Sequence, residues 1–218
     1  MEKKEYTTEE LKKLVEEGDN RYLMQLGHHL REDGEFLEAY KAYLKVVQLG
    51  NNMGNRFICT MCNENELDGF LSKEEQFNWL LRYYEVEGVN YYTSVLARWY
   101  KDGIGIKKNL DKYIYHLTQC AEDGSSACTI ELAECYENGF GVEQSYEKAF
   151  ELYDNYVDEH GKPDNTCLYK SAYYRYHELG GAKRNLEVIK RMLLRAGRFS
   201  GAAKRLYEEI FNEEFPKI

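Results

Sequence analysis

The residues whose type and spacing come nearest to metal chemistry are Cys59 and Cys62. A Cys-x-x-Cys pair is half of a typical zinc site, in which four thiolate or imidazole ligands surround the ion. No second pair follows at metal-ligand spacing, and the helical register places both cysteines on the core side of one helix. We therefore predict two buried thiols and no bound metal.

Two glycine loops have the composition of phosphate-binding loops. They are Gly103-x-Gly105 and Gly139-x-Gly141. A dinucleotide-binding fingerprint follows a strand, opens a helix and contains a third glycine. These loops follow a helical pattern and lack that third glycine. We predict that they are turns with positive φ angles, and that the chain needs no cofactor.

Nucleophilic catalysis has little support in the sequence. A Ser-x-x-Lys motif is absent, because Ser171 has no lysine three residues later and Ser72 is followed directly by Lys73. The histidines are scattered along the chain, at His28, His29, His116, His160 and His177. No Ser/His/Asp or Cys/His set is suggested, so we predict that the protein is not an enzyme.

The elements that carry these residues come from an internal repeat. Five pairs of identical residues are separated by 36 positions: Gly88 and Gly124, Ala97 and Ala133, Tyr100 and Tyr136, Gly103 and Gly139, and Gly105 and Gly141. A period in the mid-thirties is typical of stacked helix pairs. With only two prolines, almost the whole chain is free to be helical. The fold class predicted is therefore all-α.

Glycines near the end of each unit extend this register along the chain. They predict a capping helix over residues 7–17, opened by a capping box at Thr7 and Glu10, and a C-terminal cap over 198–218. We expect the second helices of the units to begin near Glu35, Ser72, Asn109, Ser145 and Asn185. The repeats of this single helical domain are predicted at about 18–49, 50–87, 88–123, 124–160 and 161–197.

Small residues mark the predicted contacts between the two helices of a unit. Equivalent positions hold Gly27, Cys59, Ala97 and Ala133, each preceded by a large aliphatic residue. A small side chain lets two helices approach closely, while its large neighbours fill the flanking space. We therefore expect these positions to be buried.

Composition limits the partners. The formal charge of −9 disfavours nucleic acid, whose phosphates need a basic surface. No apolar run approaches the length of a membrane span, and the first residues lack the apolar core of an export signal. We expect a cytoplasmic protein with no membrane or nucleic-acid partner.

The repeat motifs resemble those of the Sel-one-like repeat (SLR) family, within the tetratricopeptide-like superfamily. The pattern is Leu-Ala, Tyr, a Gly-x-Gly loop and a later Lys, and it is carried by Leu96 to Lys112 and by Leu132 to Lys148. The resemblance implies a right-handed α/α superhelix of about five helix-turn-helix repeats. It also implies an adaptor function, in which the chain binds other proteins.

One branch of this family is rich in cysteine and is exported. Its members place one disulfide per repeat at the spacing that separates Cys120 from Cys128, so the resemblance makes these two residues a candidate disulfide pair. Some members bind penicillin-type compounds. A hydrolase or β-lactam-binding protein of this type is therefore one alternative function, and an acidic immunity or inhibitor protein is another.

In such arrays the first helix of each pair lines the concave side. We expect a groove there that binds a peptide segment of another protein, acidic or ending in a carboxylate, because arginine beside aromatic residues is typical of binding hot spots. The alternative interpretation is an ordinary solvated helix face. The predicted groove residues are Arg21, Met24, His28, Arg31, Met53, Arg56, Thr60, Tyr91, Ser94, Arg98, Lys101, Ile130 and Glu134.

Overall fold

The regular structure of the chain is helical. A computed structural model describes residues 5–89, 91–156 and 161–216, and these contain twelve α-helices and one short 3-10 helix, η1 (Asn20–Tyr22). The described residues contain no strand beyond an isolated bridge between Asp68 and Leu71. The all-α prediction is confirmed. The chain forms two compact units, unit 1 (residues 1–108) and unit 2 (residues 109–218).

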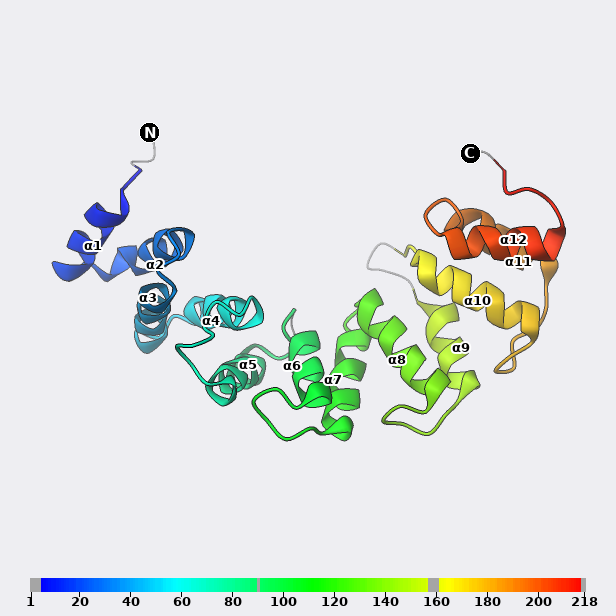
Figure 1. Ribbon diagram of the computed structural model, residues 1–218, viewed down its shortest axis with the longest axis horizontal. Coiled ribbons are helices and arrows are strands. Elements are labelled where there is room, and N and C mark those ends of the chain that lie inside the picture. Colours follow the sequence, from blue (N-terminus) through cyan, green and yellow to red (C-terminus); the bar gives the residue numbers. More distant parts are fainter. Residues whose placement is uncertain (1–4, 90, 157–160, 217–218) are drawn as a thin grey trace. The chain divides into compact units, whose positions relative to one another are not determined.

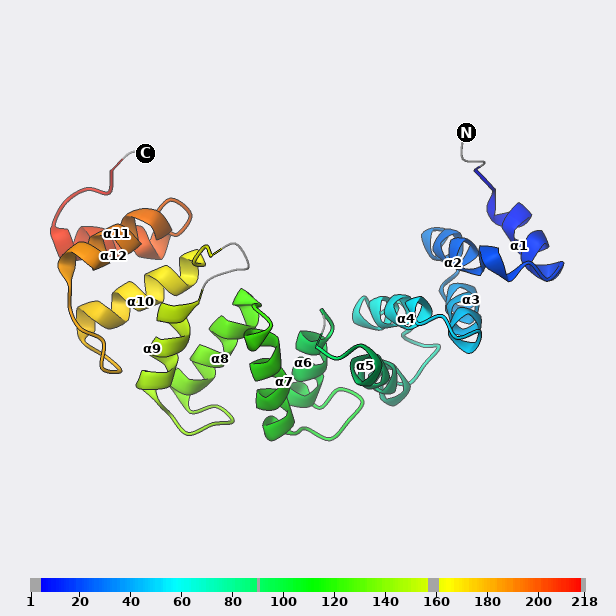
Figure 2. The ribbon, with the colours of Figure 1, turned by 180° about the vertical axis from the view of Figure 1, so that it is seen from behind.

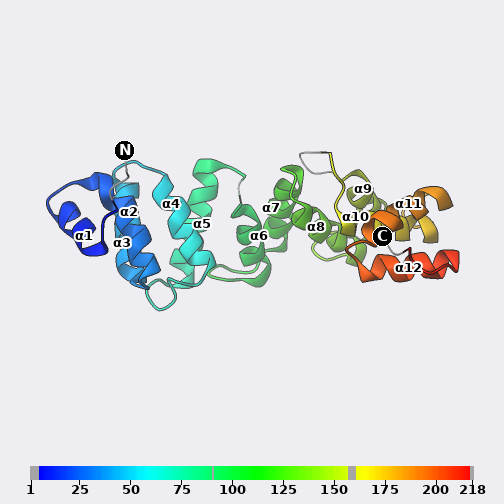
Figure 3. The same ribbon diagram turned by 90° about the horizontal axis from the view of Figure 1, so that it is seen from above.

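Unit 1 is a stack in which each helix packs on the next one along the chain (Figure 1). Seen from above, α2 and α3 lie side by side, as do α4 and α5 (Figure 3). Such nearest-neighbour packing is what a helical repeat predicts. Its helices are α1 (Thr8–Glu16), α2 (Leu23–Glu32), α3 (Phe36–Gln48), α4 (Met53–Asn63), α5 (Lys73–Glu87) and α6 (Thr93–Asp102).

Unit 2 follows the same rule, and its last three helices also pack together (Figure 2). Within the described residues, no helix of either unit is both long enough and apolar enough to cross a membrane. The helices of unit 2 are α7 (Leu110–Glu122), α8 (Ser126–Asn138), α9 (Tyr146–Asn155), α10 (Asn165–His177), α11 (Leu186–Ala196) and α12 (Gly201–Phe211).

Helix starts are set by capping residues. The N-caps of the second helices are Glu35, Ser72, Asn109, Ser145 and Asn185, as predicted. In four of them the side-chain oxygen accepts a hydrogen bond from the N–H three residues later, and Glu35 makes no such bond. The capping box of Thr7 and Glu10 is also confirmed. These side chains satisfy backbone donors that have no partner within the helix.

The small residues lie where helices meet. Ala133 and Cys59 are fully buried and Ala97 is 1% exposed, so the predicted burial is confirmed. At Gly27 a methyl group would lie 2.5 Å from the ring of Tyr43, which is itself fully buried. A larger residue at these positions would force the paired helices apart.

One glycine of each of two loops packs against a helix of the preceding repeat. A Cβ atom on Gly105 would lie 2.0 Å from the carbonyl oxygen of Lys73, in the first turn of α5. A Cβ on Gly180 would lie 2.2 Å from the carbonyl oxygen of Tyr146, in the first turn of α9. The four glycines of the predicted loops all have positive φ angles, so these loops are turns as predicted: Gly103, Gly105, Gly139 and Gly141. The contacts of Gly105 and Gly180 with a neighbouring helix were not predicted.

Candidate protein-interaction surfaces

Two of the predicted groove arginines are neutralised inside unit 1. Arg31, on α2, donates to Glu66 at 2.6 Å and also pairs with Glu64. The hydrogen bond to Glu66 raises the pKa of Arg31. Arg21 donates to both carboxylate oxygens of Asp19, at 2.8 and 2.6 Å. Because their charges are compensated, these two residues attract an acidic ligand only weakly.

His28 and Met24 take part in internal packing. The Nδ1 atom of His28 is hydrogen-bonded to the hydroxyl of Tyr43 at 3.0 Å, and its ring lies edge-on to Phe57 at 4.5 Å. Burial lowers the pKa of His28, so the ring is neutral near pH 7. Met24 is half-buried against the hydrophobic core of the first helices. Both residues therefore contribute more to the fold than to a charged surface.

Six of the predicted residues, all exposed or partly exposed, lie on α4, on α6 and just before α6. They define the α4–α6 surface: Met53, Arg56, Thr60, Tyr91, Ser94 and Arg98. The hydroxyls of Thr60 and Tyr92 are hydrogen-bonded at 2.5 Å, which ties α4 to α6. Thr60 also donates to the carbonyl oxygen of Arg56 at 3.0 Å. Arg56 therefore lies one helical turn before Thr60, the residue that is hydrogen-bonded to Tyr92.

The α4–α6 surface contains two exposed arginines and one exposed tyrosine. The side chain of Arg56 is exposed and makes no hydrogen bond or ion pair within the described residues, while the side chain of Arg98 makes one hydrogen bond, to Asn63 at 3.3 Å. The ring of Tyr91 is 76% exposed and lies edge-on to Tyr92 at 5.2 Å. Burial raises the pKa of Tyr92, and the nearby charge of Arg56 opposes this rise. The surface thus combines free cationic charge with an exposed aromatic ring.

The remaining predicted groove residues differ in environment. Lys101 is half-buried at the end of α6. In unit 2, Ile130 packs against the core around Ala133 and Tyr153, whereas Glu134 is exposed on α8. Glu137, one turn after Glu134, accepts hydrogen bonds from Lys170 and Tyr174 on α10, at 2.9 Å each. The first helices of unit 2 are therefore joined by a polar bridge.

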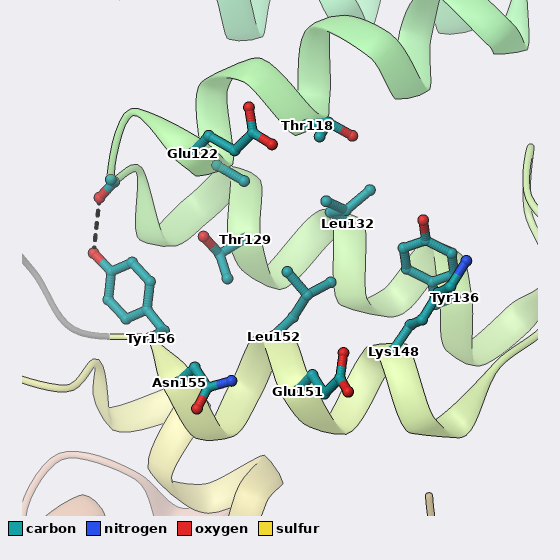
Figure 4. Close-up of a pocket in the computed structure, with 12 residues that line it drawn as sticks. Thr118, Glu122, Thr129, Leu132, Tyr136, Lys148, Glu151, Leu152, Asn155 and Tyr156 are labelled. Atoms are coloured by element: carbon teal, nitrogen blue, oxygen red, sulfur yellow. Dashed lines mark hydrogen bonds between the residues drawn. The ribbon is translucent and has the colours of Figure 1, made fainter.

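A pocket of about 590 Å³ lies between α7, α8 and α9 (Figure 4). Leu132 and Leu152 point into it, and Glu122, Lys148 and Glu151 stand at its polar edge (Figure 4). The Nζ atom of Lys148 lies 5.0 Å from the ring centre of Tyr136. This apolar hollow with a charged edge fits a hydrophobic side chain. Sequence reasoning missed it, although Leu132, Tyr136 and Lys148 are residues of the repeat motif.

Four of the six cysteines form two pairs that are close in the sequence. Cys120 and Cys128 face each other across the α7–α8 turn with Cα atoms 5.9 Å apart, a separation within the range of disulfides. Cys59 and Cys62 are fully buried, as predicted, and burial raises the pKa of both thiols. A buried thiol with a raised pKa is a poor nucleophile. Among the described residues, no three or more His, Cys, Asp or Glu side chains gather in a way that could hold a metal ion.

The family model for the Sel1 repeat matches residues 94–125 and 126–154. A search of curated protein sequences found no match.

Two solved structures are similar in fold. One is a protective antigen of uropathogenic Escherichia coli strains with an SLR fold, with 18% identity, a TM-score of 0.69 and 95% of this chain covered. The other is a Sel1 repeat protein from Oxalobacter formigenes, also with 18% identity and a TM-score of 0.69, which covers 86% of this chain. The chain spans 44% of the antigen and 75% of the second protein. At this identity the likeness concerns the fold alone.

Proposed function

Residues 94–125 and 126–154 are two consecutive Sel1 repeats in an all-helical chain, and on this basis we propose that the protein is a non-catalytic protein-interaction module. Sel1 repeat proteins generally bind other proteins. Stacked helix pairs expose one helix of each pair along a continuous surface, which is how repeat proteins present extended binding sites. The proposed ligand is a short segment of a partner protein.

The α4–α6 surface is the proposed binding site. The observation that supports this choice is the difference between Arg56 and two other arginines of the predicted groove. Arg21 and Arg31 are paired with carboxylates, whereas Arg56 is exposed and has no such partner within the described residues. An unpaired guanidinium offers a planar pair of donors that matches a carboxylate.

Aromatic and apolar neighbours extend this site. Tyr91 and Met53, which are 76% and 47% exposed, provide contact area beside Arg56. Tyrosine and arginine are enriched among residues that dominate binding energy, and methionine adapts its shape to a ligand. We propose that a carboxylate, from an acidic side chain or a chain end, pairs with Arg56 and that an apolar side chain lies on Tyr91.

A binding titration tests this proposal. Short fluorescent peptides that carry acidic residues beside an aromatic residue are compared with amide versions, in which Glu and Asp are replaced by Gln and Asn. We expect the acidic peptides to bind better, and Arg56→Glu to weaken their binding by about tenfold or more, which is about 1.4 kcal/mol. Fluorescence anisotropy measures both effects.

A matched variant controls for net charge. Lys107→Glu makes the same charge change at an exposed position outside the α4–α6 surface. It should leave the affinity within about twofold of that of the wild type. Equal weakening by Arg56→Glu and Lys107→Glu, or equal binding of acidic and amide peptides, would contradict the proposed site.

A further inference from the structure

Helix α11 has two different faces. Ile189, Leu193 and Ala196 are fully buried against the core of unit 2. Arg191, Arg195 and Arg198 are exposed and repeat at the same helical spacing, shifted by two positions. Because two positions correspond to about 200° around a helix, Arg191 and Arg195 lie on the face of α11 opposite the core, and Arg198 is exposed in the turn that follows the helix. We call these three residues the arginine stripe.

The arginine stripe belongs to a strongly basic segment of an acidic protein. The residues from Lys183 to Arg205 contain eight Lys or Arg and one Glu, in a chain whose formal charge is −9. Some of these cations are compensated: Lys190 pairs with Glu213 at 3.0 Å, and Arg184 donates to the carbonyl oxygen of Tyr176 at 2.9 Å. The three arginines of the stripe make no hydrogen bond or ion pair in the part of the chain that the structure describes.

Two arginines of the stripe open onto a pocket of about 420 Å³. Arg195 and Arg198 line it together with Lys162, at the place where the end of α11 meets the start of α10. Phe199, which is 80% exposed, and Pro163 add apolar surface to the lining. The pocket therefore presents the guanidinium groups of Arg195 and Arg198 beside an exposed aromatic ring.

The charge balance of this pocket favours a compact dianion. Arg195 and Arg198 carry like charges and line the same pocket, so they gain most from an anionic ligand that contacts both. Among the described residues, one acidic side chain lines the pocket, Asp164, and it already accepts hydrogen bonds from the backbone N–H groups of Thr166 at 2.7 Å and Cys167 at 3.3 Å. A carboxylate satisfies a single guanidinium, whereas a phosphate monoester carries about two charges and three acceptor oxygens.

Arg191 extends the basic surface beyond the pocket. Arg191 does not line the pocket and lies one turn before Arg195 on the same face of α11, about 6 Å away along the axis. We propose that this site binds a phosphorylated segment of a partner protein, with the phosphate between Arg195 and Arg198, an apolar side chain on Phe199, and a second acidic group at Arg191. It is a separate site from the α4–α6 surface, and it adds a phosphate-dependent partner to the proposed function.

Peptide binding tests this inference directly. A fluorescent peptide with a phosphoserine flanked by an aromatic residue and a glutamate is compared with its Ser and Glu forms. We expect the phosphorylated peptide to bind at least tenfold more tightly than either form. The double variant Arg195→Gln/Arg198→Gln should abolish that preference, while Arg205→Gln, an equally exposed arginine on α12 outside the pocket, should retain it.

Three results would overturn the inference: equal binding of the Glu peptide, no binding of the phosphopeptide, or equal weakening by Arg205→Gln. Phenyl phosphate provides a further arm, because an affinity equal to that of the phosphopeptide would assign the pocket to a small phosphate ester and not to a protein segment. Arg56→Glu should leave phosphopeptide binding unchanged, so failure of this site and failure of the α4–α6 surface are distinguishable.

Discussion

At the scale of single residues, burial decides which titratable groups are charged. His116 on α7 is 3% exposed, and burial, with a smaller effect from Lys112, lowers its pKa to about 4. In the unfolded chain a histidine has a pKa near its ordinary value of about 6.5. Between these two values the unfolded state binds a proton that the folded state does not bind.

This difference predicts a dependence of stability on pH. As the pH falls from about 6.5 to about 4, protonation of His116 in the unfolded chain should lower the free energy of unfolding, by up to about 3 kcal/mol. Above about pH 7 the histidine is neutral in both states and makes no such contribution. Urea unfolding of the wild type and of His116→Gln at several pH values measures the effect.

Carboxylates also titrate in acid, so the contribution of His116 is measured as the difference between the pH profiles of the wild type and the variants. His116→Gln should lose less stability than the wild type over this pH range. His177→Gln, at an exposed position on α10, should follow the wild type. Parallel pH profiles for the wild type and His116→Gln would show that burial does not hold this histidine neutral.

The sequence predicted the positions of the groove arginines, but not which of them form ion pairs. Helical spacing places Arg21, Arg31 and Arg56 on the first helices, because spacing is a local property. Whether each charge is free depends on partners that the spacing does not reveal. The partners of Arg31 lie 33 and 35 residues away, and they reach it only once two repeats have packed together.

At the scale of helices and loops, local sequence signals predicted where the second helix of each repeat begins. In four of these five helices the N-cap side chain bonds a backbone N–H three residues later, so the signal lies in the sequence next to the helix start. The role of the loop glycines was predictable only as a turn. Contact between Gly105 and the first turn of α5 joins residues about thirty positions apart, and it appears only when the repeats stack.

The loop contact predicts a large effect for one added methyl group. Gly105→Ala adds the cost of a positive φ angle, about 1 kcal/mol, and places a Cβ atom 2.0 Å from the Lys73 carbonyl oxygen. We expect a total loss of about 2–4 kcal/mol in the free energy of unfolding, because backbone must move to relieve the clash. Chemical denaturation measures this loss.

Gly50→Ala is the matched control in the same unit. Gly50 also has a positive φ angle, of 84°, but a Cβ atom there would meet nothing within 4 Å. Its loss should be limited to the conformational cost of about 1 kcal/mol. If both variants were destabilised equally, the packing of Gly105 against α5 would have no energetic importance.

At the scale of the whole chain, the net charge does not reveal how charge is distributed along the sequence. The formal charge of −9 correctly describes the sum, but it hides the basic segment from Lys183 to Arg205. That segment is visible in the sequence as a run of charges of one sign, and local counting would have revealed it. The pockets were not predictable in this way, because their shape depends on how side chains from three or more elements pack.

The central claim is that an acidic peptide binds the α4–α6 surface, and methionine methyl resonances test it most directly. Met53 is 47% exposed on α4, Met61 is fully buried on the same helix, and Met192 lies on α11 in unit 2. In a titration of methyl-labelled protein with an unphosphorylated acidic peptide, the account predicts that the Met53 signal shifts while those of Met61 and Met192 stay in place, and that Arg56→Glu removes the shift. An unmoved Met53 signal under conditions where the peptide is bound would contradict it.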